Sequence, residues 1–127
     1  GFRISSGETS TTTFLDSISI LQTTNDNYIA TIEYDPTITG LTYSSITNCP
    51  IQYSLGDGIT TVNQDGFIFN NILGKAGSLG VTDFKLINNS IQPGIKINGT
   101  PTTVWLCITP LANNSKFRAS FNINYFN

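Results

Sequence analysis

The fold is decided by the stretch Lys116-Phe-Arg-Ala-Ser-Phe-Asn-Ile-Asn-Tyr-Phe-Asn127. Its apolar side chains alternate with polar ones and share one face of an extended chain: Phe117, Ala119, Phe121, Ile123 and Tyr125. A repeat of two residues is typical of a β-strand that is buried on one side. We therefore predict a long strand over residues 117–125.

Similar but shorter alternating segments recur along the rest of the chain, for example at residues 14–20, 28–34, 51–55 and 102–109. In the first of these we expect Phe14, Ile18 and Ile20 to share the apolar face. Turn dipeptides such as Asn98-Gly99 separate the segments, and no segment keeps a helical period. The pattern predicts an all-β protein of about eight or nine short strands, namely an immunoglobulin-like antiparallel sandwich.

The length of 127 residues favours one domain. The composition changes only near the start, where residues 5–13 contain no large apolar side chain and four threonines. Such a stretch cannot order itself by burial. We expect residues 1–13 to form an N-terminal extension and residues 14–127 to form a single β-sandwich domain.

The composition excludes several functions. Only six residues are basic, and the net charge is −2, so we expect no nucleic-acid partner. No apolar run is long enough for a membrane-spanning helix. Without histidine, neither a Ser-His-Asp triad nor a Cys-His pair can be built, and two cysteines alone do not complete a zinc site. We expect no enzyme activity, no cofactor and no metal.

The two cysteines, Cys49 and Cys107, leave two interpretations open. In the first, they form one disulfide in an oxidising compartment, and closing that loop stabilises the folded state by about 4 kcal/mol. Alternatively, they are two small buried hydrophobic residues. The first interpretation agrees with an extracellular or cell-surface location, as does a chain that begins at Gly1 rather than Met, whether by processing or by excision.

Three Asn-X-Ser/Thr sequons occur, at Asn88, Asn98 and Asn113. They are possible glycosylation sites in a secreted protein, although a chain rich in Asn, Ser and Thr also contains such triplets by chance. Asp65 and Asp57 precede glycines. Carboxylates in loops suit calcium, but turn formation is the commoner role of Asp-Gly, and we favour it.

Both ends of the chain resemble one family. The start, Gly1-Phe-Arg-Ile-Ser-Ser-Gly-Glu-Thr-Ser-Thr-Thr-Thr-Phe14, resembles the N-terminal arm of Afa/Dr-type fimbrial subunits. The end, Phe117-Arg-Ala-Ser-Phe-Asn-Ile-Asn-Tyr-Phe-Asn127, resembles the closing strand of chaperone–usher pilins, which carries an aromatic residue near the terminus. Archaeal extracellular threads share the general design.

The resemblance implies assembly by donor-strand complementation, in which the N-terminal arm of one subunit completes the sandwich of the next. It implies a structural subunit of an extracellular adhesive filament, a fimbria or pilus, whose partners are identical subunits, a periplasmic chaperone and usher, and a host receptor or glycan. The groove would be flanked by the terminal strand, at Phe117, Ala119, Phe121, Ile123 and Tyr125. The donor arm would use one alternating set of side chains, either the even-numbered set or the following: Phe2, Ile4, Thr9, Thr11 and Thr13.

Two other interpretations stay open. A β-rich chain with few charges also suits a receptor- or glycan-binding head of a viral or phage fibre, or a lectin, in which residues 1–13 would be the remnant of a stalk. A coat or surface-layer protein is the third possibility.

Overall fold

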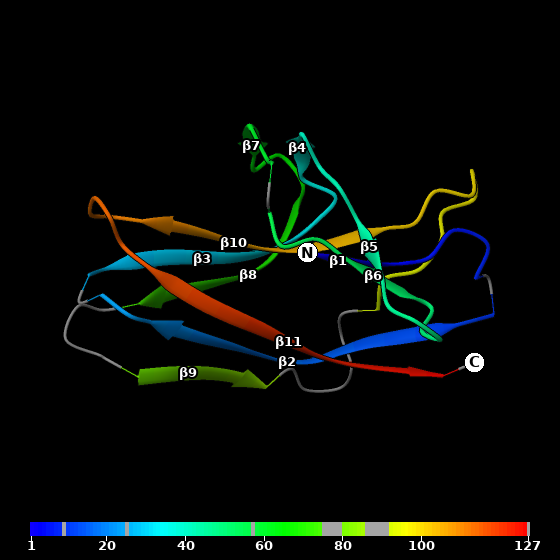
Figure 1. Ribbon diagram of the computed structural model, residues 1–127, viewed down its shortest axis with the longest axis horizontal. Coiled ribbons are helices and arrows are strands. Elements are labelled where there is room, and N and C mark those ends of the chain that lie inside the picture. The colour runs from blue at the N-terminus through cyan, green and yellow to red at the C-terminus, as the bar shows by residue number, and fades with distance from the viewer. Residues whose placement is uncertain (9, 25, 57, 75–79, 86–91, 127) are drawn as a thin grey trace.

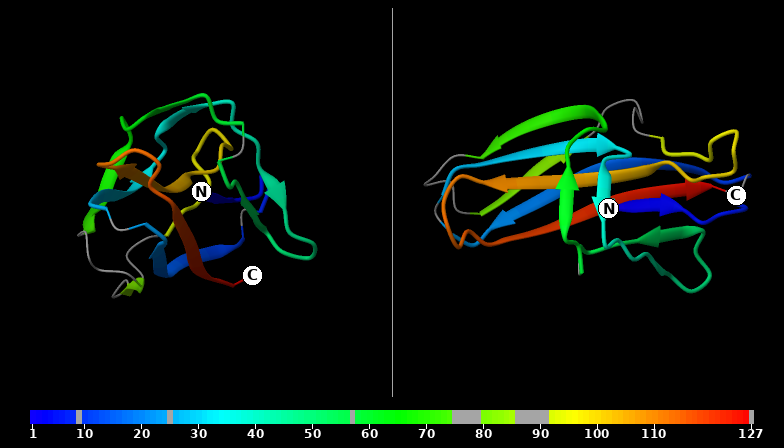
Figure 2. Two further views of the ribbon diagram at one scale, coloured as in Figure 1. Left: turned by 60° about the vertical axis from the view of Figure 1, so that its left-hand side comes forward. Right: turned by 90° about the horizontal axis from the view of Figure 1, so that it is seen from above.

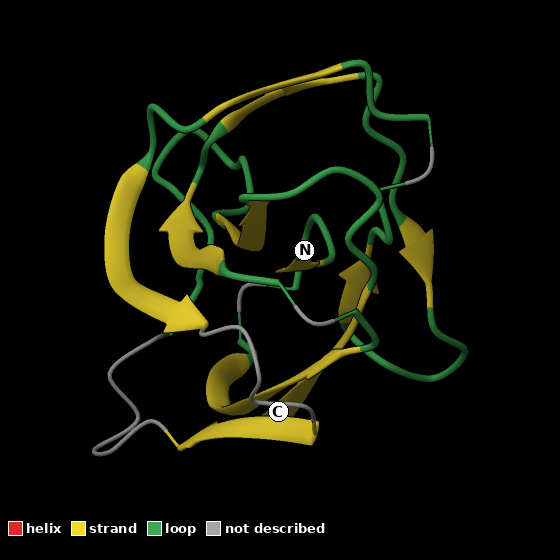
Figure 3. Ribbon diagram, turned by 90° about the vertical axis from the view of Figure 1, so that its left-hand side faces the viewer, coloured by secondary structure: helices red, strands yellow, loops and turns green. Residues whose placement is uncertain are grey.

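The computed structural model describes residues 1–8, 10–24, 26–56, 58–74, 80–85 and 92–126. Within these ranges the chain forms eleven strands and no helix (Figure 3), which confirms the predicted all-β class. The strands in chain order are β1 (Phe2–Ile4), β2 (Thr12–Gln22), β3 (Tyr28–Tyr34), β4 (Thr37–Thr39), β5 (Ser44–Ser45), β6 (Ile51–Tyr53), β7 (Thr61–Asn63), β8 (Phe67–Gly74), β9 (Gly80–Lys85), β10 (Thr103–Pro110) and β11 (Phe117–Phe126).

Two antiparallel sheets form the body of the molecule. The larger has the order β5-β6-β1-β10-β3-β8, and the smaller has the order β11-β2-β9. Figure 1 shows the smaller sheet as a separate layer along one side of the larger one. A third sheet pairs only β4 with β7 and projects from the body. We call this two-stranded element the flap.

The core lies between the two large sheets. It joins Leu15, Ile18 and Ile20 of β2 to Ala30 and Ile32 of β3, all of them buried. Full burial of a leucine or isoleucine side chain stabilises the fold by roughly 1.5–3 kcal/mol. The alternation that was visible in the sequence therefore becomes a sandwich, because each sheet has one apolar face and these faces meet.

A β-bulge in β2 changes one predicted core position. Along the pairing of β11 with β2, Asn122 lies opposite Ser17 but Ile123 lies opposite Leu15, so Asp16 is the extra residue. An extra residue reverses the side-chain alternation beyond it. Leu15 is therefore fully buried, whereas Phe14, which we expected on the core face, is half-buried.

The first residues differ from the predicted extension. Residues 2–4 form β1, which pairs with β6 on one side and β10 on the other. Phe2 and Ile4 are each 1% exposed. The predicted boundary after Thr13 falls inside β2, where Thr13 is buried. In this single chain the N-terminus lies in the middle of the molecule (Figure 2), because the two apolar side chains around Arg3 are enough to dock a short strand.

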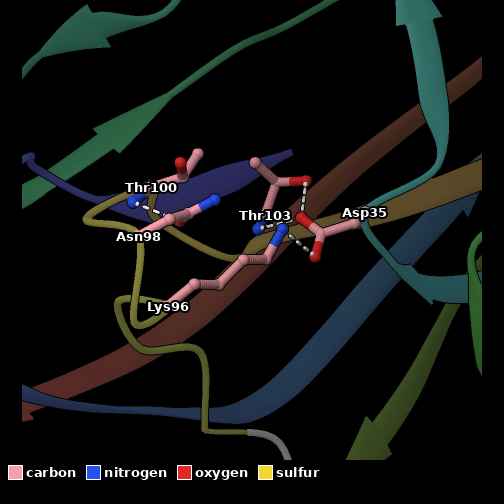
Figure 4. A network of polar contacts seen from close by, with 5 residues as sticks. All are labelled: Asp35, Lys96, Asn98, Thr100 and Thr103. Atoms are coloured by element: carbon pink, nitrogen blue, oxygen red, sulfur yellow. Dashed lines mark hydrogen bonds and ion pairs between the residues drawn. The ribbon is translucent and has the colours of Figure 1, made fainter.

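Asp35 anchors the chain where β3 ends. It has a positive φ of 49°, and Pro36 follows it, so the strand stops there as predicted. Its Oδ1 accepts hydrogen bonds from the backbone N–H of Thr103 at 2.9 Å and the hydroxyl of Thr103 at 3.2 Å (Figure 4). Its Oδ2 forms an ion pair with Lys96 at 2.9 Å. The side chain thereby fixes the start of β10.

Replacing Asp35 with alanine is expected to lower the free energy of unfolding by about 2 kcal/mol, because two hydrogen bonds to Thr103 are lost at a left-handed position. Lys96→Ala and Asp35→Asn should each cost about 1 kcal/mol or less, since the first removes a half-exposed ion pair and the second keeps an acceptor oxygen. Urea denaturation measures all three. If Asp35→Ala and Lys96→Ala lower the free energy of unfolding equally, the ion pair is the dominant contact of Asp35.

Candidate functional site: an apolar groove between two open strand edges

A groove of about 1090 Å³ opens beside the N-terminus. Its walls come from the second half of β10, the middle of β11, the flap, and the segment around β6. Gly1 and Phe2 line it as well, so β1 begins at the groove and does not fill it. The groove therefore follows the open edge of β10, from the space beside β11 to the outer face of the larger sheet under the flap.

The two longest walls are strand edges without a partner. β10 pairs with β3 along residues 104–110, but on its other edge β1 reaches only Thr103 and Val104. β11 pairs with β2 on one edge only. Within the described part of the chain, no strand covers residues 105–110 of β10 or the outer edge of β11. Such edges present free backbone N–H and C=O groups to any extended segment that enters the groove.

The groove is lined mainly by apolar side chains, several of which are exposed to solvent. Leu55 is 80% exposed, and smaller fractions of Ile46 and Val62 are also exposed. From β10 come Leu106 and Ile108, which also pack against the core. An exposed lining that is mainly apolar is typical of a binding surface.

The five side chains predicted on the terminal strand do not share one environment. Ala119, Phe121 and Ile123 line the groove. Phe117 packs instead against the ring of Tyr28, with centroids 4.8 Å apart. Tyr125 is 38% exposed near the end of β11. The middle of β11 is therefore the part that meets the groove.

The residues predicted for the donor arm are distributed over two strands and the segment between them. Phe2 and Ile4 lie in β1, and Thr13 lies in β2, while Thr11 is buried just before β2. Thr9 lies outside the described residues. Between the two strands, Ser6 and its neighbours up to residue 8 are exposed, and Gly7 has a φ of 89° with open space around it.

The amino group of Gly1 is held at the groove in an unusual electrostatic state. It donates a hydrogen bond to the carbonyl oxygen of Ser54 at 2.8 Å, and its Cα lies against the ring of Trp105. Burial lowers the pKa of this amine from 8.0 to about 5, although the nearby Cys107 acts in the opposite direction. The amine is therefore neutral at pH 7 while β1 is docked.

The predicted disulfide is not present: Cys49 and Cys107 are both free thiols. The physical reason is that they lie on opposite sides of the larger sheet. Cys49 packs against the core, whereas Cys107 alternates with the core-facing Leu106 and Ile108 and points to the outer face. Burial, followed by the charge of Glu33, raises the pKa of Cys107 to about 12.

The other predicted sites are dispersed. Asn98 accepts a hydrogen bond from the N–H of Thr100 in an exposed turn, Asn113 is exposed, and Asn88 lies outside the described residues. Asp65 supports the flap, since its carboxylate accepts two hydrogen bonds of 2.8 Å from Thr37, and these bonds lower its pKa.

The described residues contain no group of three or more acidic or cysteine side chains placed to hold a metal. None of their regular elements is a helix that is long and apolar enough to cross a membrane.

The flap and the open edge of β10 were not anticipated from the sequence. The flap strands, Thr37-Ile-Thr39 and Thr61-Val-Asn63, are each three residues long, which is too short for alternation to be distinguished from chance. In the sequence, the segment that forms β10 resembles the other strand segments. Alternation does not reveal the order of strands in a sheet, so the open edge could not be predicted.

The fold and groove define an antiparallel β-sandwich with an open slot along the edge of β10. No protein-family model, no curated protein and no solved structure matches the chain.

Proposed function

We propose that this chain is a structural subunit of an extracellular adhesive filament, and that copies of it join by donating a strand into one another's groove. The observation that carries the proposal is the apolar groove bounded by the unpaired edges of β10 and β11. A strand placed there would satisfy backbone groups of both sheets at once, which is the geometry of β-augmentation.

The segment proposed as donor is the N-terminal arm, residues 1–11. In the single chain its first part already forms a strand with β6 and β10. If the arm leaves this place and enters the same place on a neighbour, every contact is re-formed between subunits. Such an exchange of identical elements changes the energy little and is a common route to assemblies. The exposed segment around Gly7 is suited to act as the hinge.

The groove also explains why an exchanged arm can gain contacts. β1 occupies only two positions along β10, and residues 105–110 remain open, a length of roughly 20 Å. Because β1 runs antiparallel to β10 with Phe2 opposite Val104, an arm covers this edge only if it shifts its register toward Pro110. An arm from another subunit can make that shift, because it is not bound by the link to its own β2. It would then cover Phe121 and Ile123, which the single chain leaves half-buried.

Assembly through such a groove calls for partner proteins. A groove that is apolar and open before assembly is an aggregation hazard. A periplasmic chaperone that lends a strand, and an usher that replaces the chaperone with the next arm, would solve that problem. Adhesion to a host receptor or glycan would use the outer surface of the assembled filament.

The experiment that tests the proposal compares three chains by light scattering and electron microscopy. The unaltered chain should form linear, SDS-resistant polymers. Deletion of residues 1–10, which leaves β2 intact, should abolish them. A peptide of residues 1–11 should bind the deleted chain as a discrete complex. A discrete trimer or monomer of the unaltered chain would favour the fibre-head alternative and overturn the proposal.

A groove variant provides the matched control. Ala119 lines the groove and is exposed, so Ala119→Arg should block an incoming strand without disturbing the core. Asn124→Arg places the same charge on an exposed position of the same strand, where Asn124 does not line the groove. Polymers should be lost in the first variant and kept in the second. Polymers that persist in Ala119→Arg would show that the arm binds elsewhere.

A further inference from the structure

A polar cluster lies on the outer face of the larger sheet, and two of its members, Gln64 and Cys107, line the groove. β3 contributes Thr31 and Glu33, β10 contributes Cys107, and the segment after β7 contributes Gln64. Cys107 lies directly opposite Thr31 in the strand pairing. The hydroxyl of Thr31 donates to Glu33 Oε2 at 2.9 Å and accepts from Gln64 Nε2 at 3.2 Å.

Glu33 is the unusual member of the cluster. It is 0% exposed, and its Oε1 has no hydrogen-bond partner. A buried carboxylate oxygen without a partner carries a substantial free-energy cost, and such groups are concentrated at sites where chemistry occurs. The structure therefore contains a buried hydrogen-bond acceptor with unused capacity.

The thiol of Cys107 faces two of the other side chains. Cys107 lies opposite Thr31, whose hydroxyl bonds both Glu33 and Gln64, and Cys107 and Gln64 both line the groove. Burial and the charge of Glu33 raise the pKa of the thiol, so it keeps its proton unless a neighbouring base removes it. Glu33 is that neighbour. A nucleophile, a base and an acyl group that can be attacked are thus brought together by three separate segments.

We propose that Cys107 and Gln64 form an internal thioester. The sulfur attacks Cδ of the Gln64 amide while Glu33 accepts the thiol proton. The tetrahedral intermediate then expels Nε2, to which Glu33 returns the proton, and ammonia leaves. One S–C bond forms and one C–N bond breaks, so no oxidant or other reactant is needed. Glu33 ends in its starting state and acts as a general base and then as a general acid.

Thr31 has a positioning role in this reaction. Its hydroxyl accepts from the Gln64 amide and donates to Glu33, so it holds the acyl group and the base at the same place. The bond would join the larger sheet to the segment that follows β7. It would fasten the flap over the outer face. The inference does not depend on the proposed function, because it uses only side chains within one chain.

Intact mass spectrometry tests the proposal directly. The mass of the unaltered chain should be lower than the mass of its sequence by one ammonia. Methylamine should open the thioester, add its own mass at Gln64 and free the Cys107 thiol. Cys107→Ala and Gln64→Ala should each have the full mass of their sequence. Cys49→Ala is the matched control, and it should keep the loss of ammonia.

Two further measurements separate chemistry from folding. Glu33→Gln keeps the size of the side chain but removes the base, so thioester formation should slow by roughly 10²-fold or more. Circular dichroism will show whether this variant keeps its sheets. Independently, iodoacetamide added to the denatured unaltered chain should alkylate Cys49 and spare Cys107. A full sequence mass, or equal alkylation of both cysteines, would overturn the proposal.

Discussion

Phe2→Ala is expected to lower the free energy of unfolding of the monomeric subunit by about 3–5 kcal/mol, the usual cost of truncating a fully buried phenylalanine. Phe2 is 1% exposed, belongs to the core cluster, and meets the ring of Phe121 edge-on at a centroid distance of 5.2 Å. Its loss removes the contact that holds β1 against β11. Urea denaturation at low protein concentration measures the effect.

The adjacent Arg3 provides the control. Arg3 lies on the opposite face of β1, where it donates to Gln52 Oε1 at 2.9 Å and lies 4.0 Å from the centre of the Tyr43 ring. Arg3→Ala should cost only about 1 kcal/mol, since a half-buried cation loses one hydrogen bond and one ring contact. If Phe2→Ala lowers the free energy of unfolding as little as Arg3→Ala does, the arm is free in the monomer.

The Phe2→Ala variant also connects stability to assembly. If arms are exchanged between subunits, Phe2 is buried in a neighbour, and its contribution becomes a binding energy that depends on protein concentration. The stability of the unaltered chain should then rise with concentration, and the Phe2→Ala chain should lose most of that dependence.

The fold class could be predicted from the sequence because alternation is a local property. The segment that became β11 shows it over ten residues, and the segments of β3 and β10 show it over seven and eight. Where the pattern failed, a local irregularity was the cause. The bulge at Asp16 shifts the alternation within β2, and nothing in the sequence of Phe14-Leu15-Asp16 indicates which of the first two residues is buried.

The candidate site could be predicted only in part, because it depends on how distant strands are ordered. The sequence indicated that the middle of β11 has an apolar face, and Ala119, Phe121 and Ile123 do line the groove. It did not indicate that β10 has an open edge. It also hid the docked position of β1, since a strand of three residues next to a polar segment resembles a flexible tail.

The cysteines also depend on tertiary structure that the sequence does not reveal. Two cysteines in a sandwich suggest a disulfide when only their number is known. Pairing requires side chains on facing surfaces, and Cys107 points away from the core against which Cys49 packs. The polar cluster around Cys107 draws on β3, β10 and the segment after β7, so only the tertiary structure brings it together.

The docked arm should be less stable at pH 5 than at pH 8. Burial lowers the pKa of the Gly1 amine from 8.0 to about 5 in the docked state, and release of the arm restores the ordinary value. Between these two pH values the released amine binds more protons than the docked one, so docking stability rises with pH and is lost as the pH falls. Three pKa units correspond to at most about 4 kcal/mol.

The sequence makes this effect easy to isolate. The chain has no histidine, so no side chain with an ordinary pKa titrates between pH 5 and 8. An NMR titration of the Gly1 methylene protons should give a pKa near 5. A chain lacking residues 1–10 is the control, and its stability should be flat across the same range.

The direction of the effect links the Gly1 amine to assembly. Acidification should release the arm from its own sheet and so increase the fraction of subunits that can donate it. We therefore expect polymerisation of the unaltered chain to start faster at pH 5.5 than at pH 8. A pKa near 8 for the amine, with equal polymerisation rates at both pH values, would mean that the arm is already undocked in solution. In that case the groove, rather than the arm, would control when subunits join.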